Sequence, residues 1–102
     1  MKVIVLRPVA EFIDALDTPV RADVYRLIEL LEQYGHALPM PYAKPIGRGL
    51  RELRYTGRPH VRILFGFCKG NVVLVHAIKK QRAALTERDL RLAERRFAAY
   101  CA

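Results

Sequence analysis

The stretch Leu50–Phe67, LRELRYTGRPHVRILFGF, decides the fold. Residues 56–59, TGRP, have the composition of a turn and separate two runs rich in apolar side chains. Successive side chains of a strand point to opposite faces, so one face of the second run is apolar. The residues on that face are Val61, Ile63, Phe65 and Phe67. The stretch therefore predicts a β-hairpin, with strands at about 50–55 and 60–67, buried on one side.

The second face of this hairpin is charged, because alternation places Glu52 and Arg54 beside Arg62. The chain has few helices, so we expect this face to lie open. Lys79 and Lys80 approach it from the end of a later strand. Arginine forks bind phosphate oxygens at two points, and lysine adds a point charge. The cluster suits metal-independent cleavage of RNA by its own 2′-hydroxyl, although a solvated charged face is the simpler interpretation of the pattern alone.

The rest of the chain supplies helices and further strands. Pro8 and Pro19 suit first helical turns, with Thr18 as the expected cap of the second helix. Three prolines and two glycines in residues 36–49 predict a loop. The expected elements are a strand at 3–6, a helix from Pro8, a helix from Pro19 to Gly35, strands at 50–55, 60–67 and 72–79, and a helix at about 87–100. This order predicts a single α+β domain, with two N-terminal helices and a C-terminal helix packed on a small, mainly antiparallel sheet.

Regular alternation also assigns the side chains of the strand at 72–79. His76 shares a face with Val72, Leu74 and Ile78, opposite Lys79. This pattern predicts a hydrogen-bonded core histidine.

Charge is concentrated in one part of the sequence. The formal net charge is +8 over 102 residues. Residues 1–43 carry four basic and six acidic side chains, whereas residues 44–102 carry fourteen and four. A basic half indicates a polyanion or an acidic partner, and an arginine-rich solvated surface is the alternative.

The remaining composition indicates the cellular compartment of the protein and the state of its cysteines. No apolar run is long enough to cross a bilayer, and the N-terminus lacks the pattern of a secretory signal. Cys68 and Cys101 form no metal-binding spacing, so we expect free thiols in a reducing, cytoplasmic compartment. We expect no metal and no cofactor.

Several short motifs together resemble the RelE/HigB superfamily of type II toxins, and most closely its HigB-like branch of phage-derived proteins. The resemblance covers about residues 35–100. The motifs are KPIGRGL at 44–50, ELR at 52–54, RILF at 62–65, HAIKK at 76–80 and a helix beginning near Thr86. The resemblance implies a RelE-like fold and an mRNA endonuclease acting on the ribosome. It also implies inhibition by a helix-turn-helix antitoxin, often encoded by the adjacent gene.

The resemblance also implies residue roles. The expected catalytic residues are Arg54, Arg62, Lys79 and Lys80. The expected RNA-binding residues are Lys44, Arg51, Glu52, His60 and Arg82. The C-terminal tyrosine of RelE has no evident counterpart here, which leaves the general base unassigned. Two alternatives stay open: a ParE-like toxin that inhibits gyrase by binding, and a binding protein that has lost catalysis.

Overall fold

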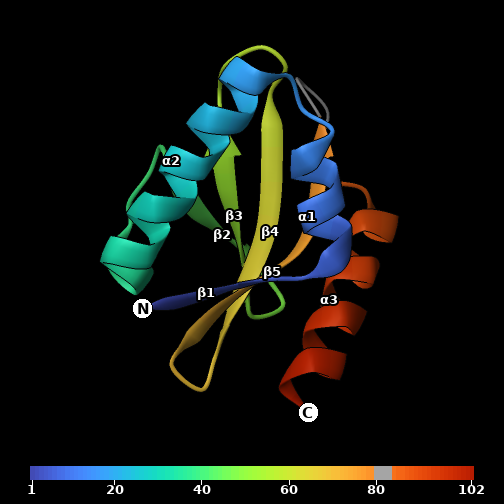
Figure 1. Ribbon diagram of the computed structural model, residues 1–102. Helices are drawn as coiled ribbons and strands as arrows, with labels where there is room; N and C mark the ends of the chain where they lie inside the picture. Colours follow the sequence, from blue (N-terminus) through green and yellow to red (C-terminus); the bar gives the residue numbers. More distant parts are fainter. Residues whose placement is uncertain (80–83) are drawn as a thin grey trace.

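The computed structural model describes residues 1–79 and 84–102, and a five-stranded sheet organises them (Figure 1). The strand order is β1-β5-β4-β3-β2. The strands are β1 (Lys2–Val5), β2 (Ala43–Gly47), β3 (Leu50–Tyr55), β4 (Val61–Cys68) and β5 (Asn71–Lys79). β1 runs parallel to β5, and the other neighbouring strands are antiparallel. The predicted α+β class and the predicted central hairpin are confirmed.

Three α-helices pack on this sheet: α1 (Arg7–Asp14), α2 (Thr18–Tyr34) and α3 (Glu87–Cys101). In Figure 1, α1 and α2 lie in front of the strands, and α3 runs along the right side. Asp17, not Thr18, is the N-cap of α2, and it makes no side-chain capping hydrogen bond, so the predicted cap is wrong. Among the described residues, no helix has the length and apolar character needed to span a bilayer.

The two faces of the sheet bury separate apolar clusters. The first joins α1 and α2 to the face that carries Ile63, Phe65 and Leu74. The second joins α3, through Ala93, to Leu64 and the opposite face. The expectation that this second face lies open is therefore wrong where α3 packs on β4 and β5. What remains accessible is the portion beside β2 and β3.

Residues 43–47 form a strand where the sequence predicted a loop. β2 pairs with β3 alone, with Lys44 opposite Glu52 and Pro45 opposite Arg51. Proline is tolerated in such an edge strand because its missing N–H need not join a second ladder. The register shifts between Pro45 and Gly47, and Gly47 has a positive φ of 85°. The Pro- and Gly-rich composition thus marks an irregular edge strand.

A β-bulge reverses the alternation of β5. Leu64 pairs with His76 but Phe65 pairs with Leu74, so Val75 is an extra residue in β5. After this point, His76 and Ile78 share a face with Leu64 and Arg62, opposite the face that carries Leu74. The predicted placement of His76 with Leu74 is therefore wrong. The bulge leaves the Val75 carbonyl outside the regular ladder, and Arg96 of α3 donates a 3.0 Å hydrogen bond to it.

The two cysteines are joined, contrary to the expectation of free thiols. Cys68 ends β4 and Cys101 ends α3, and they form a disulfide across a Cα–Cα distance of 6.0 Å. The docking of α3 on β4 and β5 brings them together, which a sequence separation of 33 residues does not reveal. The bond fixes the C-terminal end of α3 to the sheet.

Candidate nucleic-acid interface

A groove of about 380 Å³ lies on the accessible part of the second face. β2, β3 and β4 form its floor and one side, and the chain leading into α3 forms the other side. Its lining residues are Lys44, Pro45, Ile46, Glu52, Arg62, Ala84, Leu85 and Leu90. Charged side chains therefore come from the strands, and apolar side chains come mainly from β2 and the α3 segment.

Three charged side chains meet on this face of the sheet, and two of them, Glu52 and Arg62, line the groove. Arg54 and Arg62 are direct partners in the ladder between β3 and β4. The Nε atom of Arg54 lies 3.3 Å from Oε1 of Glu52, and the Nε atom of Arg62 lies 3.8 Å from Oε2. Both are ion pairs by distance, and neither oxygen is held by an aligned hydrogen bond from these atoms. The predicted meeting of Arg54, Arg62 and Glu52 on one face is confirmed.

These side chains differ in their exposure to water. Glu52 is 1% exposed, whereas the side chains of Arg54 and Arg62 are 31% and 15% exposed. The carboxylate thus lies beneath the two guanidinium groups. Among the described residues its Oε1 is a buried acceptor without a hydrogen-bond partner, an arrangement that calls for a physical explanation. Such burial leaves little of Glu52 for a direct contact with RNA, which the sequence analysis expected.

Lys44 adds a third cation to the groove. It is half-buried and lies directly opposite Glu52 in the ladder between β2 and β3. Cross-strand partners lie on the same face of a sheet, so Lys44 and the two arginines surround one carboxylate. Lys44, Arg54, Arg62 and Glu52 carry a net positive charge at this position, which suits an anionic ligand.

The opposite wall of the groove is apolar. Leu85 is partly buried and packs on the second core cluster, as does Ile46 on the β2 side, and Leu90 lies one turn into α3. These residues were not predicted as part of the site, because a groove wall at that position depends on how α3 docks.

The other predicted site residues are not brought into the groove. Lys79 pairs with Val61, and Arg51 pairs with Phe65, so both lie on the face of the α1–α2 core. His60 directly precedes β4, is half-buried and does not line the groove. Lys80 and Arg82 lie outside the described residues. Of the predicted set, the groove therefore contains Lys44, Glu52 and Arg62, and Arg54 lies next to it as the cross-strand partner of Arg62.

His76 joins β5 to α3 through side-chain contacts. Its Nε2 lies 3.0 Å from Oδ1 of Asp89, and Arg96 lies 3.3 Å from its Nδ1. Arginine can only donate, so Nδ1 accepts and Nε2 carries the proton that faces Asp89. Burial alone raises the pKa of Asp89, but hydrogen bonds with His76 and Thr86 outweigh it and lower the pKa to about 2. Thr86 and Asp89 also form a capping box at the start of α3.

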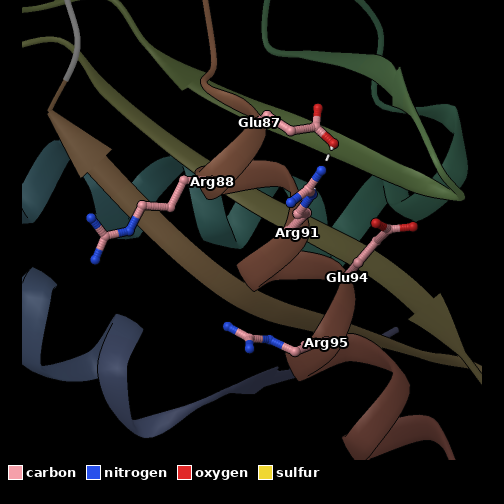
Figure 2. Close-up of a pocket in the computed structure, with 5 residues that line it drawn as sticks. All are labelled: Glu87, Arg88, Arg91, Glu94 and Arg95. Carbon is pink, nitrogen blue, oxygen red and sulfur yellow. Dashed lines mark hydrogen bonds and ion pairs between the residues drawn. The ribbon is translucent and has the colours of Figure 1, made fainter.

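A second basic surface lies on the outer side of α3. It comprises Arg88, Arg91 and Arg95, and we call it the α3 arginine surface (Figure 2). Figure 2 shows Arg88 and Arg95 extending to the same side of the helix, while Arg91 turns toward Glu87. The distance between Arg91 Nε and Glu87 Oε1 is 3.3 Å.

The acidic residues beside this surface already have a partner in the turn between β2 and β3. Arg48 donates hydrogen bonds of 2.6 and 2.7 Å to Glu87 and one of 3.0 Å to Glu94. The hydrogen bond to Glu87 raises the pKa of Arg48, and the same bond lowers the pKa of Glu87. Arg48 thereby connects the edge of the sheet to α3 beside the groove.

Taken together, the described sheet, its three α-helices and the groove lined by Lys44 and Arg62 define a small α+β protein with a positively charged face. The family model described as "Phage derived protein Gp49-like (DUF891)" matches residues 11–98, and the chain belongs to this family. This is a type II toxin family of the HigB/RelE-like kind, consistent with a toxin role and implying an antitoxin partner. Among curated proteins, none matches the chain significantly.

Proposed function

We propose that this protein is the toxin of a type II toxin–antitoxin system and an endoribonuclease that cleaves mRNA on the translating ribosome. The observation that carries the proposal is the direct cross-strand pairing of Arg54 with Arg62, the second of which lines a groove together with Lys44. Like charges placed opposite each other in a sheet repel, and such a pair is stabilised when an anion binds between or above it. A phosphodiester is an anion of this kind.

The arrangement supports transition-state stabilisation. In RNA cleavage, the 2′-oxygen attacks phosphorus, the bond to the 5′-oxygen breaks, and the products carry a 2′,3′-cyclic phosphate and a 5′-hydroxyl. Negative charge grows on the non-bridging oxygens during attack. Arg54 and Arg62 project from paired strands. Because these strands are rigid, the guanidinium groups can be held in position before the reaction begins. Lys44 contributes charge from the neighbouring strand.

The apolar wall supports binding of a nucleotide as well as a phosphate. Leu85 and Leu90 lie across the groove from the charged floor. A base can pack on such a wall while its phosphate contacts the arginines, and single-stranded RNA exposes its bases for contacts of this kind. The resemblance to HigB-like toxins supplies the expectation that the ribosome presents the mRNA.

The experiment is brief induction of the protein in cells, followed by primer extension on cellular mRNAs. We expect new 5′ ends inside translated reading frames within minutes. The same mRNAs should then be incubated with purified protein, with and without assembled ribosomes, to test ribosome dependence. Intact mRNA together with inhibited gyrase would refute the nuclease and support the ParE-like alternative. Intact mRNA together with active gyrase would support the remaining alternative, a binding protein that has lost catalysis.

A second experiment tests the antitoxin. We expect the product of an adjacent gene, a small helix-turn-helix protein, to restore growth when co-expressed and to co-purify with the toxin. The basic half of the chain favours rapid association with an acidic segment of that partner. Failure of both rescue and co-purification would contradict the toxin–antitoxin assignment of that gene pair.

A further inference from the structure

Glu52 presents a physical problem that the proposed reaction does not explain. A carboxylate in a phosphate-binding groove repels the ligand, and its burial carries a large desolvation cost unless it is paired. Glu52 is nevertheless the one buried charged residue among the described residues, at 1% exposure. Replacing it by an apolar residue would remove both costs. Its presence therefore indicates a task that a neutral side chain cannot perform.

The contacts of Glu52 indicate what this task is. It approaches both Arg54 and Arg62 through their Nε atoms, at 3.3 and 3.8 Å. Nε lies at the inner end of the guanidinium group, next to the aliphatic chain. A contact there restricts rotation of the planar group and leaves its outer edge, which carries the terminal nitrogens, directed away from the carboxylate. One buried anion can thus orient two arginines at once.

Burial and register support the same interpretation. Arg54 and Arg62 are cross-strand partners, so without an anion near both Nε atoms their guanidinium groups would repel each other and turn apart. Glu52 lies two residues before Arg54 on the same strand face and is opposite Leu64, a fully buried core residue. The rigid core beneath the carboxylate fixes its position. The arginines above it are partly exposed and meet the groove.

We propose that Glu52 is a positioning residue that aligns Arg54 and Arg62 for binding the scissile phosphate. The role in cleavage rests on the proposed nuclease function, whereas the alignment of the two arginines does not. Oε1, which has no hydrogen-bond partner in the described part of the chain, fits this role, because it lies within ion-pair distance of Arg54 Nε but is not aligned with it. A small rotation of the guanidinium group when phosphate binds would complete that hydrogen bond.

The first test observes the arginines directly and requires no activity. In NMR spectra of the whole protein with inorganic phosphate added, the Nε–Hε groups of Arg54 and Arg62 should be visible and protected from exchange with water. Glu52→Gln, which keeps the shape but removes the charge, should abolish this protection. Glu29→Gln, an exposed change on α2, is the matched control and should alter neither signal. Unchanged signals in folded Glu52→Gln protein would overturn the proposal.

The second test separates orientation from charge. Removing an anion makes the groove more positive, so Glu52→Gln should bind an mRNA with a 2′-deoxy substitution at the cleavage position at least as tightly as the wild type. Misplaced arginines should nevertheless lower the single-turnover cleavage rate by about 100-fold. Binding and cleavage that weaken by the same factor, or a wild-type cleavage rate, would contradict a positioning role.

A shorter carboxylate provides an independent check. Glu52→Asp keeps the charge but withdraws it from both Nε atoms, so its cleavage rate should fall between those of wild type and Glu52→Gln. If Glu52→Gln does not fold, Glu52→Asp decides the question: wild-type Nε–Hε signals and rate would overturn the proposal. If wild-type protein cleaves no RNA, the nuclease assignment fails, and the NMR comparison still decides whether Glu52 aligns the arginines.

Discussion

Arg54 and Arg62 face each other directly across the β3–β4 ladder, and both contact the buried carboxylate of Glu52. Two cations in opposed positions destabilise an isolated pair of strands. Here the anion beneath them offsets the repulsion, and the groove above them can receive a second anion. A single arginine at this place would cost less stability than two. The presence of both therefore indicates that the pair has a function.

Arg62→Ala should abolish toxicity while leaving the fold and the antitoxin complex intact. Loss of one preorganised donor typically slows such a reaction by about 100- to 1000-fold. Single-turnover cleavage by purified protein measures the effect, and thermal unfolding verifies the fold. Arg7→Ala is the control, because Arg7 is an exposed arginine at the start of α1. Full cleavage activity in folded Arg62→Ala protein would remove Arg62 from the site.

Lys44→Ala should weaken RNA binding uniformly across sequences. A lysine that contacts phosphate contributes through counterion release, so the slope of log affinity against log salt concentration should decrease by about 0.7. Fluorescence anisotropy with a non-cleavable RNA at several salt concentrations gives the slope. Lys2→Ala changes an exposed lysine on β1, at the other edge of the sheet, and should leave the slope unchanged. A sequence-dependent loss would instead indicate base recognition by Lys44.

Asp89→Asn should remove an acid-sensitive part of the stability. The pKa of Asp89 is about 2 in the folded protein, below its ordinary value. A depressed pKa stabilises the fold above the ordinary value, near pH 4, and this contribution disappears as the pH falls toward 2. Urea unfolding should therefore show a difference of about 2 kcal/mol between wild type and variant at neutral pH, shrinking toward pH 2. Asp17→Asn, at a cap without a side-chain hydrogen bond, is the control. A difference that stays constant with pH would contradict this linkage.

Reduction of the disulfide should destabilise the protein. Cys68 and Cys101 are separated by 33 residues, and closing a loop of that size contributes about 4 kcal/mol in the chain-entropy account. Urea unfolding with and without reductant measures the loss in wild type. The Cys101→Ser variant should have the stability of the reduced wild type, both with and without reductant. Alkylation of both thiols in unreduced, folded protein would show that the bond is not formed.

Gly66→Ala should disturb the docking of α3. A Cβ atom at Gly66 would lie 2.5 Å from Cε1 of Phe97, closer than two carbons can approach. We expect destabilisation of about 1–3 kcal/mol from the forced shift. Phe97→Leu shortens the opposing side chain. It should lower the free energy of unfolding less in the Gly66→Ala background than in wild type, and a double-mutant cycle measures this difference. Additive effects would show that the two positions do not meet.

Local patterns in the sequence were sufficient for the hairpin, the helices and the charged face. The alternation in residues 60–67 and the helical spacing of Val20, Val24 and Ile28 depend on near neighbours alone, and these elements are confirmed. The pairing of Arg54 with Arg62 follows from the hairpin register, so the main pair of the site could also be predicted.

The features that could not be predicted all depend on distant partners. Residues 43–47 form the strand β2 because they pair with β3, in spite of Pro45. The face of His76 depends on a bulge against β4, and the disulfide depends on where α3 ends. The burial of Glu52 likewise depends on side chains from other strands. None of these relationships is visible in the spacing of residues within one element.

The extra residue at Val75 has a consequence for comparing this chain with its relatives. Because side chains alternate, a strand that kept Val75 in the regular ladder would place His76 on the face of Leu74, toward the other core, whereas the bulge places it toward α3. A relative with one residue fewer there would build a regular strand and keep its histidine on the α3 side. A relative of the same length therefore needs the bulge to anchor α3 in this way, even where its motifs look alike.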